Sequence, residues 1–340
     1  MSAMPAMSAG AAVADRVAAV RIGPEEAGRR LDAWLADRFT YHSRSEWQRL
    51  IAEVRIRVND APARPSRLLR LADEIRFEVG YLPEPPVSLD VAIVHDDPLF
   101  LAVNKPAPLP CHPAGPFFRH TLWHLLRERY GVIHLVNRLD RETSGLVLVA
   151  RNPRTAATLA TCEIRKTYLV VVAGRFPEAL DAEGWLMPDE NCDVRKKRRF
   201  LLKDAVSGDA LPAEAETART RFRRRAESAS WSLLEAELDT GRTHQIRATL
   251  CSLGYPVLAD KLYGPDPRLF LRAMTNELTS ADRALLILPH QALHAWRLAF
   301  AHPGDGSPVA IAAPLPQPLN DFCISQFGSE FAAQDEAHRR

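Results

Sequence analysis

The residues best suited to chemistry stand in the segment from His134 to Arg151, directly before a run of apolar residues. Its chemically capable side chains are Asn137, Arg138, Asp140, Thr143 and Ser144. The following run, Leu146 to Ala150, is wholly apolar, which is typical of a buried central strand. A strand is therefore expected to hold the polar loop at a cleft, with Gly145 at the turn. An aspartate in such a loop can act as nucleophile, acid, base or metal ligand, so the segment alone leaves the role of Asp140 open.

A second chemical signal lies about a hundred residues further on, in Gly-Arg-Thr-His-Gln-Ile-Arg at 241–247. The apolar pattern of 231–238 predicts a strand before it, and Thr243 is expected to cap a helix that ends at Gly254. Arg247 then lies on the first turn of this helix. A cation there could pair with an aspartate across a cleft and keep it ionised. Taken by itself, the pattern is more often that of a surface arginine.

Composition indicates a globular protein that is not disulfide-bonded. The chain has 340 residues, 46% of them hydrophobic and 25% charged, a length that suits two domains. Its five cysteines are widely spaced and include no Cys-x-x-Cys pair, which favours a reducing compartment and argues against a zinc knuckle. No apolar run approaches the roughly 20 residues of a membrane span. We expect a cytoplasmic monomer without membrane association, and disordered tails at 1–28 and 326–340.

The first part of the chain is rich in arginine. Between Arg29 and Val79 there are eleven arginines, eight acidic residues and no lysine, an excess of three positive charges (11 − 8). Arginine binds phosphates and stacks on bases, which favours RNA as a partner, although a solvated surface explains the charge equally well.

The hydrophobic pattern of this part predicts two helices followed by two strands. Leu31, Trp34, Leu35 and Phe39 have helical spacing, and Ser43 with Glu46 forms a possible capping box for a second helix. Alternating residues at 54–58 and 75–79 predict strands. With Arg-Leu-Asp at 30–32, Ser-Arg-Ser at 43–45 and Val-Asn-Asp at 58–60, residues 29–80 resemble the RNA-binding domain of ribosomal protein S-four. They depart from it where Glu53-Val54-Arg55 replaces the usual glycine-containing turn.

Prolines 83, 85 and 86 mark a linker at 81–90 before a second domain at 91–325. Strands are expected at 91–94, 99–103 and 166–174, the last with Tyr168 near its start, and helices at 119–130 and 152–163. The region 189–225 reads as irregular; its basic clusters at 195–199 and 223–225 are expected to form an RNA-facing surface or solvated loops. His120 and His124 could share a helix face, but no third ligand stands at a suitable spacing, so no metal site is expected.

The motifs of this second domain together resemble the RluA-type pseudouridine synthases. They are Asn-Arg-Leu-Asp-Arg-Glu-Thr-Ser-Gly at 137–145, Lys-Thr-Tyr at 166–168, the segment 241–247, Leu-Gly-Tyr-Pro-Val-Leu-Ala-Asp-Lys-Leu-Tyr-Gly at 253–264 and Leu-His-Ala at 293–295. The family usually has histidine where this chain has Asn137. The resemblance implies isomerisation of uridine to pseudouridine in ribosomal or transfer RNA, without a cofactor.

The resemblance also implies roles for individual residues. Asp140 is expected to be the nucleophile and Arg247 its ionic partner. Tyr168 would stack on the uracil, Ile246 would form an apolar wall of the pocket, and Arg138 would hold the nucleotide outside the RNA stack. The order of elements lacks a regular βαβ alternation and so predicts an α+β fold with a mostly antiparallel central sheet.

Two other classes of function remain open at this point. The first is a non-catalytic RNA-binding or ribosome-assembly protein on the same fold, suggested by Asn137. It would not release tritium from C5-labelled uridine in RNA. The second is a metal-dependent hydrolase that uses some of the eleven histidines. Such an enzyme would be sensitive to chelators.

Overall fold

The computed structural model describes residues 17–38, 44–78, 84–114, 116–192, 194, 196–205, 211–212 and 214–328. The described residues up to Pro86, together with Pro113–Arg119, form a smaller compact unit. Val87–His112 and the described residues from His120 onward form a larger one. Within these described ranges, no helix is long and apolar enough to cross a membrane. The expected capping residue Ser43, Phe39 and Val79 fall outside them, as do residues 1–16 and 329–340 of the expected tails.

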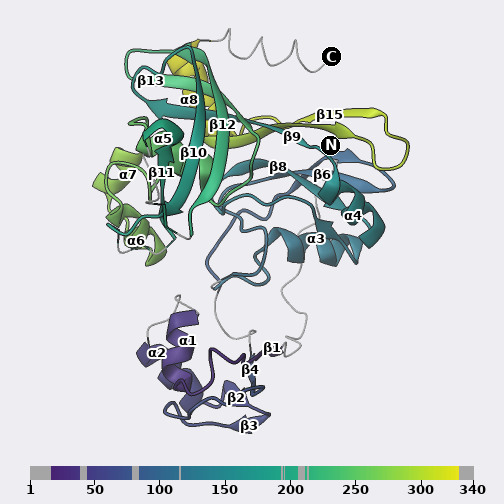
Figure 1. Cartoon of the computed structure of the whole chain (residues 1–340), viewed down its shortest axis with the longest axis vertical. Helices are drawn as coiled ribbons and strands as arrows, with labels where there is room; N and C mark the ends of the chain where they lie inside the picture. The colour runs from purple at the N-terminus through teal and green to yellow at the C-terminus, as the bar shows by residue number, and fades with distance from the viewer. Residues whose placement is uncertain are drawn as a thin grey trace. The chain divides into compact units, whose positions relative to one another are not determined.

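The smaller unit has the expected two helices followed by strands, with one further strand, β1, before the helices. Its elements are β1 (Val17–Arg21), α1 (Leu31–Arg38), α2 (Arg44–Ala52), β2 (Ile56–Val58), β3 (Ala61–Pro62) and β4 (Glu74–Glu78). The strands form an antiparallel sheet in the order β1-β4-β2-β3 (Figure 1). Trp34, Leu35, Trp47 and Ile51 bury the apolar faces of the two helices in its core.

The expectation of a disordered tail up to residue 28 was wrong for residues 17–28. Val17–Arg21 pair along their whole length with β4, for example Val20 with Ile75, and Ile22 is buried in the core. The partner strand lies more than fifty residues away in the sequence, so no local pattern indicated it. At the other end, the helix α8 (Gln317–Phe327) continues into the first two residues of the expected C-terminal tail.

The turn that departs from the usual glycine contains a strained residue. Val54 has a φ of 60°, while its backbone N–H donates to Ile51 and that of Arg55 donates to Leu50, which closes the end of α2. A β-branched residue in the left-handed region is disfavoured by about 1–2 kcal/mol relative to glycine. The turn therefore keeps the shape that a glycine would allow, at a cost in stability.

The larger unit is an α+β fold, as expected. Its strands are β5 (Ala92–Asp96), β6 (Phe100–Lys105), β7 (His134–Leu135), β8 (Ser144–Ala150), β9 (Arg165–Ala173), β10 (Ala179–Pro188), β11 (Arg198–Leu202), β12 (Glu216–Glu227), β13 (Trp231–Leu238), β14 (Leu293–Ala301) and β15 (Pro308–Ala312). Its helices are α3 (Leu122–Tyr130), α4 (Pro153–Thr161), α5 (Gln245–Ser252), α6 (Arg268–Met274), α7 (Ser280–Leu286) and α8, with a 3-10 turn at Lys203–Ala205.

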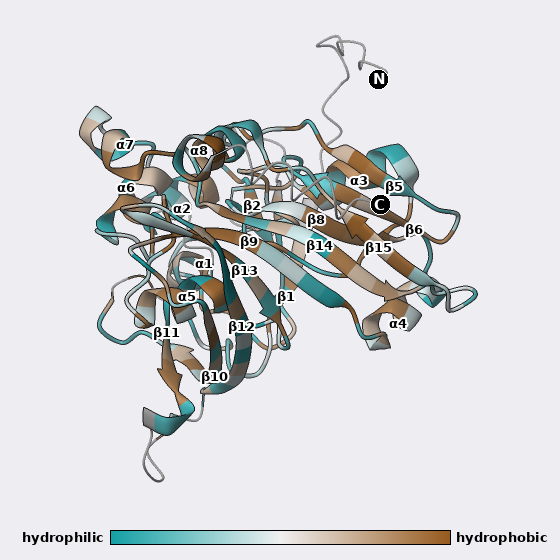
Figure 2. Cartoon of the chain, turned by 90° about the horizontal axis from the view of Figure 1, so that it is seen from above, coloured by the Kyte–Doolittle hydropathy of each residue, from teal (hydrophilic) through white to brown (hydrophobic). Residues whose placement is uncertain are grey.

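The strands of the larger unit form one mixed, mostly antiparallel sheet. In the described residues it has eleven strands, in the order β11-β10-β12-β13-β9-β14-β8-β6-β5, with β15 on β14 and β7 on β8. The β14–β8 pair is parallel. Alternate residues of β9 enter two cores: Val170 and Val172 pack in one, Leu169 and Val171 in the other. All seven residues of β8 are buried, and Figure 2 shows β8 and β9 largely brown, which agrees with their central place.

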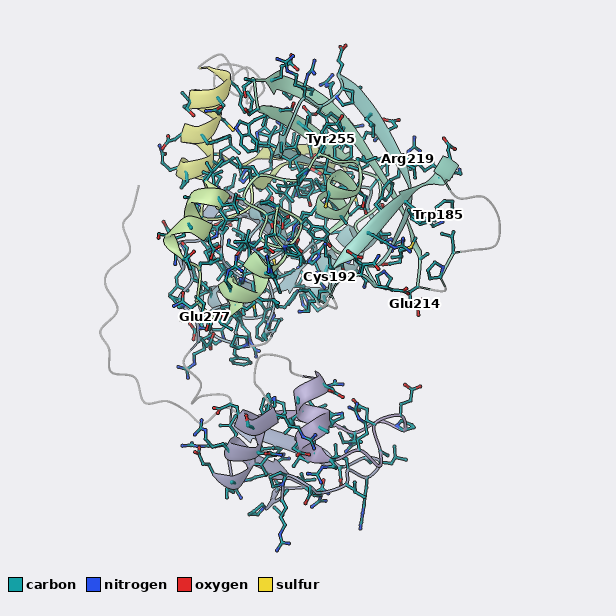
Figure 3. All side chains as sticks on the ribbon, turned by 90° about the vertical axis from the view of Figure 1, so that its left-hand side faces the viewer. Trp185, Cys192, Glu214, Arg219, Tyr255 and Glu277 are labelled. Atoms are coloured by element: carbon teal, nitrogen blue, oxygen red, sulfur yellow. The ribbon has the colours of Figure 1, made fainter. Side chains whose placement is uncertain are left out.

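The expectation that 189–225 is irregular was wrong, because β11 lies within it and β12 begins in it. In β12, Ala218, Thr220 and Phe222 face the core and alternate with arginines. Arg221 and Arg223 lie opposite Glu237 and Glu235 of β13 and form ion pairs with them. Arg219, labelled in Figure 3, pairs with Asp239. The expected free basic surface at 223–225 is therefore a ladder of compensated charges.

We predict that Val54→Gly stabilises the smaller unit by about 1 kcal/mol, because glycine removes the strain of the positive φ. Val54→Ala is the matched control, since it keeps the Cβ atom and should gain less. Hydrogen exchange of the amides of α2 and β2 measures the change. Faster exchange in Val54→Gly than in the wild-type protein would show that the turn is not strained.

Candidate active site

Asp140 lies in the loop that leads into the centre of the sheet. Gly145, at the start of β8, has a φ of 113°, and a Cβ atom placed there would lie 2.3 Å from the carbonyl oxygen of Ala295 in β14. Gly145 therefore allows the close parallel pairing of β8 with β14. Ala295 in turn pairs with Tyr168 of β9, so the Asp140 loop and Tyr168 reach the same level of the sheet from different strands.

The buried Lys105 and the neighbouring Cys111 make hydrogen bonds to the backbone of the Asp140 loop. Lys105 is fully buried, and its Nζ donates to the carbonyl oxygens of Pro106, Leu109 and Arg141 at 3.0, 2.8 and 3.3 Å. Burial lowers the pKa of Lys105 to about 8. The Sγ atom of Cys111 also contacts the backbone N–H and carbonyl of Leu139. These bonds fix the backbone on both sides of Asp140.

Asn137, which stands where the family usually has histidine, has a structural role in this chain. Its Nδ2 donates to the carbonyl oxygen of Leu146 at 3.2 Å, and its Oδ1 accepts from the N–H of Leu148 at 2.8 Å. The side-chain amide thus pairs with the backbone of β8 next to the short strand β7. Asn137 thereby anchors the loop to the sheet.

The expected ion pair between Asp140 and Arg247 is present. Nη1 of Arg247 donates to Oδ2 of Asp140 at 2.7 Å. Arg247 lies in the first turn of α5, which packs against β10 and β11. The expected cap at Thr243 was wrong: the helix follows His244, which has a left-handed φ of 59° and no side-chain cap bond. Instead, the side chain of Gln245 closes the preceding turn by accepting from Thr240 and from the N–H of Arg242.

The electrostatic surroundings keep Asp140 ionised. Burial alone would raise its pKa, but the charge of His244 when this imidazole is protonated, the charge of Arg247 and the hydrogen bond from Arg247 lower it below the ordinary value. Burial also lowers the pKa of His244 to about 4, so near pH 7 this imidazole is neutral and Arg247 supplies the positive charge. The Asp140 side chain is 25% exposed. The site therefore presents an accessible carboxylate anion, which can act as a nucleophile or a base.

The other expected site residues have distinct positions. Tyr168 is 7% exposed, and burial together with the charge of Asp140 raises the pKa of its phenol. Ile246 packs in the same core as Tyr168. Arg138 is exposed, makes no ion pair with a described residue, and its charge helps to lower the pKa of Asp140. The site thus combines an anion, an aromatic side chain, an apolar side chain and an available cation.

Two neighbours of Arg247 had no role assigned from the sequence. Asp260 accepts from both Nε and Nη2 of Arg247, at 2.6 and 2.9 Å, and the ring of Tyr263 lies 4.9 Å from the guanidinium carbon. Both residues belong to the motif at 253–264. The presence of this family motif indicated that the segment matters for the site. The spacing of residues within a loop, however, does not indicate which side chains reach Arg247.

A metal centre is not supported by the described part of the chain. There, no group of three or more His, Cys, Asp or Glu residues is placed to hold an ion. His124 is buried on α3 and contacts Glu128, one turn away, at 3.1 Å. Among the described residues, His120 and His124 therefore belong to no such group of ligands.

Comparisons with known proteins agree with this geometry. The family model described as RNA pseudouridylate synthase matches residues 99–252, and the S4 domain model matches residues 29–75. Ribosomal large subunit pseudouridine synthase D of Xanthomonas campestris is 32% identical over 92% of this chain and 93% of its own. An uncharacterized RNA pseudouridine synthase of Chloroflexus aurantiacus is 33% identical over 88% of this chain and 90% of its own.

Solved structures share the fold of the larger unit. Human RNA Pseudouridylate Synthase Domain Containing 1 has a TM-score of 0.52 and 22% identity, and covers 69% of this chain and 87% of its own. Human RNA Pseudouridylate Synthase Domain Containing 4 has the same TM-score and identity. With relatives above 30% identity along nearly its whole length, and with an S4 domain ahead of the synthase motifs, the chain belongs to the RluA-type RNA pseudouridine synthases, which are isomerases.

Proposed function

We propose that Asp140 is the nucleophile with which this synthase isomerises uridine in RNA. The observation that carries the proposal is an accessible, ionised carboxylate held by the buried Arg247. Oδ2 of Asp140 accepts the hydrogen bond from Arg247, whereas Oδ1 accepts no hydrogen bond from a described residue and lies 3.9 Å from Nε2 of His244. Oδ1 is therefore the oxygen proposed for the attack. An attack on the sugar and an attack on the base both require this oxygen to be ionised.

The chemistry of the isomerisation fits the groups that the site supplies. The N1–C1′ bond of uridine breaks, C5 bonds to C1′, and a proton leaves C5 while N1 gains one. Atoms and electrons balance without an oxidant, a reductant or an external group, so no cofactor is needed. The protein must supply a nucleophile, orientation of the freed uracil and a route for the proton.

The remaining site residues suit the binding of an extruded nucleotide. We propose that Tyr168 stacks on the uracil, that Ile246 forms an apolar wall, and that Arg138 holds the nucleotide outside the stack. A target base must leave an RNA helix before the carboxylate of Asp140 can reach it. Arg138 is exposed and pairs with no described acid, which supports its role, since its guanidinium can bind a phosphate or stack on a base.

We propose large-subunit ribosomal RNA as the substrate, because relatives that align along nearly the whole chain carry that name. Residues 17–80 would form the RNA-binding domain, 81–90 the linker and 91–327 the catalytic domain. Most described arginines of the smaller unit pair with acids, as Arg49 does with Glu46 and Glu53. Arg57, Arg64 and Arg70 make no ion pair with any described residue, so these three are proposed to contact phosphates.

We further propose that the protein works as a monomer in the cytoplasm, with RNA as its partner and no membrane association. The five cysteines are all free thiols, as expected in a reducing compartment. Sedimentation equilibrium tests the first point, and a stable dimer at micromolar concentration would contradict it.

We predict that Asp140→Asn abolishes turnover and leaves folding and RNA affinity unchanged, because the substitution removes the charge and keeps the shape. Tritium release from C5-labelled RNA measures turnover. Asp181→Asn is the matched control, since Asp181 is exposed and unpaired among the described residues. Multiple turnover in Asp140→Asn would rule out the nucleophile.

We predict that Arg247→Met lowers kcat by about 10²- to 10³-fold and moves the acid limb of the pH profile to higher pH. Arg247 lowers the pKa of Asp140, so the carboxylate normally stays ionised as the pH falls. Without Arg247 this pKa rises, and activity is lost at a higher pH. An unshifted acid limb would show that the ion pair does not control Asp140.

We predict that substituting glutamine for Arg57, Arg64 and Arg70 together weakens RNA binding while kcat at saturating RNA is retained. The slope of log affinity against log salt should become shallower by about 0.7–0.9 for each phosphate that the variant no longer binds. Arg49→Gln is the control, because Arg49 is already paired with two acids. An unchanged slope in the triple variant would exclude these arginines from the RNA interface.

A further inference from the structure

The motif at 253–264 contains a carboxylate that is withdrawn from solvent completely. The side chain of Asp260 is 0% exposed. Its Oδ1 accepts from Nη2 of Arg247 and from the backbone N–H groups of Leu262 and Tyr263, each at 2.9 Å. Its Oδ2 accepts from Nε of Arg247 at 2.6 Å. Every partner of this carboxylate is a donor, so it is a well-satisfied buried anion.

The orientation of Arg247 is set by Asp260 to a greater degree than by Asp140. Two of its nitrogens bind Asp260 in a forked arrangement, whereas one binds Asp140. The guanidinium is rigid and planar, so fixing Nε and Nη2 also fixes the direction of Nη1. The ring of Tyr263 packs 4.9 Å from the guanidinium carbon. Nη1 is therefore aimed at Oδ2 of Asp140 before RNA binds.

The charges of these three groups do not cancel. One guanidinium is shared between two carboxylates, which leaves a net charge of −1. Asp260 is fully buried and accepts two hydrogen bonds from Arg247. It therefore offsets much of the positive charge with which Arg247 would otherwise stabilise Asp140 alone. Asp140 keeps enough positive charge nearby to remain ionised, but it is not neutralised. Such a balance suits a carboxylate that must donate electrons to the substrate.

We propose that Asp260 is a positioning residue of this synthase, which acts on Asp140 only through Arg247 by aiming Nη1 and by offsetting the guanidinium charge. The proposal rests on the proposed role of Asp140 as nucleophile. It assigns a function to the second carboxylate of the site, which does not touch the substrate. In this proposal, the motif at 253–264 holds Arg247 of helix α5 in the orientation that pairs with Asp140.

The alternative is that Asp260 only shapes its own loop, through its bonds to the N–H groups of Leu262 and Tyr263. Asp260→Asn separates the two roles. Asparagine can keep an oxygen at Oδ1 for these N–H groups, while it removes the charge and places an amide donor against Nε of Arg247. A role limited to the loop predicts little loss of activity in this variant.

The experiment compares Asp260→Asn, Arg247→Met and the double variant in the full-length protein, with tritium release measured under steady-state conditions over a range of RNA concentrations. We expect Asp260→Asn to lower kcat by roughly 10- to 100-fold with KM within about twofold of wild type, as for a misplaced catalytic group. In the Arg247→Met background, Asp260→Asn should cause no further loss. Losses that multiply in the double variant, or an unchanged kcat in Asp260→Asn, would overturn the proposal.

Thermal unfolding gives an independent reading of the same pair. Arg247→Met leaves the buried charge of Asp260 without its cation, so its Tm should fall sharply. Adding Asp260→Asn removes that charge and should recover most of the Tm. If Asp260→Asn alone does not fold, the comparison of the double variant with Arg247→Met still decides the proposal. No recovery of Tm, or a further fall in kcat, would contradict it.

A matched control is available outside the site. Asp282 accepts from Nε and Nη2 of Arg272 at 2.9 and 2.7 Å, the same forked geometry between α6 and α7. Asp282→Asn should leave kcat unchanged.

The test of Asp260 can also be told apart from the test of the proposed function. Activity in Asp140→Asn would refute the nucleophile, whereas the exchange of stability between Arg247 and Asp260 does not depend on catalysis.

Discussion

The guanidinium of Arg247 is 8% exposed and is compensated by two carboxylates from separate segments of the chain. Removing a charge from water costs several kcal/mol unless the charge is paired and its donors are satisfied. Asp260 meets this requirement with two hydrogen bonds, and Asp140 meets the rest with one. This cluster forms only when three segments are correctly placed relative to one another: α5, the loop at 253–264 and the loop that leads into β8. The rest of the active site is arranged around it.

The sheet makes that agreement possible. Asp140 lies before β8, Tyr168 is in β9, and Arg247 follows β13, yet β13, β9, β14 and β8 are consecutive neighbours in the sheet. Backbone pairing of these strands thus brings together segments that lie more than a hundred residues apart in the sequence. Gly145 is required where β8 meets β14, because any Cβ atom would collide with the backbone of Ala295. A nucleophile on a loop is kept in place by strands that cannot shift without breaking their ladder.

Local pattern predicted the elements whose signal is local. The apolar runs of β8 and β9, the start of α4 near Asn152 and the helices of the smaller unit were all readable, because each depends on neighbouring residues. β1 was missed because its partner β4 is distant in sequence. β12 was missed because its exposed arginines obscured the alternation of Ala218, Thr220 and Phe222. The pairing of Asp140 with Arg247 was predicted through the family motifs, whereas the second carboxylate at 260 needed the fold, since a loop has no fixed period.

The ionisation of the Asp140 carboxyl group is the central point of this account, because a nucleophile or base must be ionised throughout the working pH range. The most direct measurement is a pH titration of the side-chain carboxyl of Asp140 by ¹³C NMR, assigned by comparison with Asp140→Asn. The account predicts that its resonance titrates below the ordinary aspartate pKa of about 3.9, because Arg247 stabilises the anion. Titration above that value would mean that burial outweighs the ion pair, and would contradict the account.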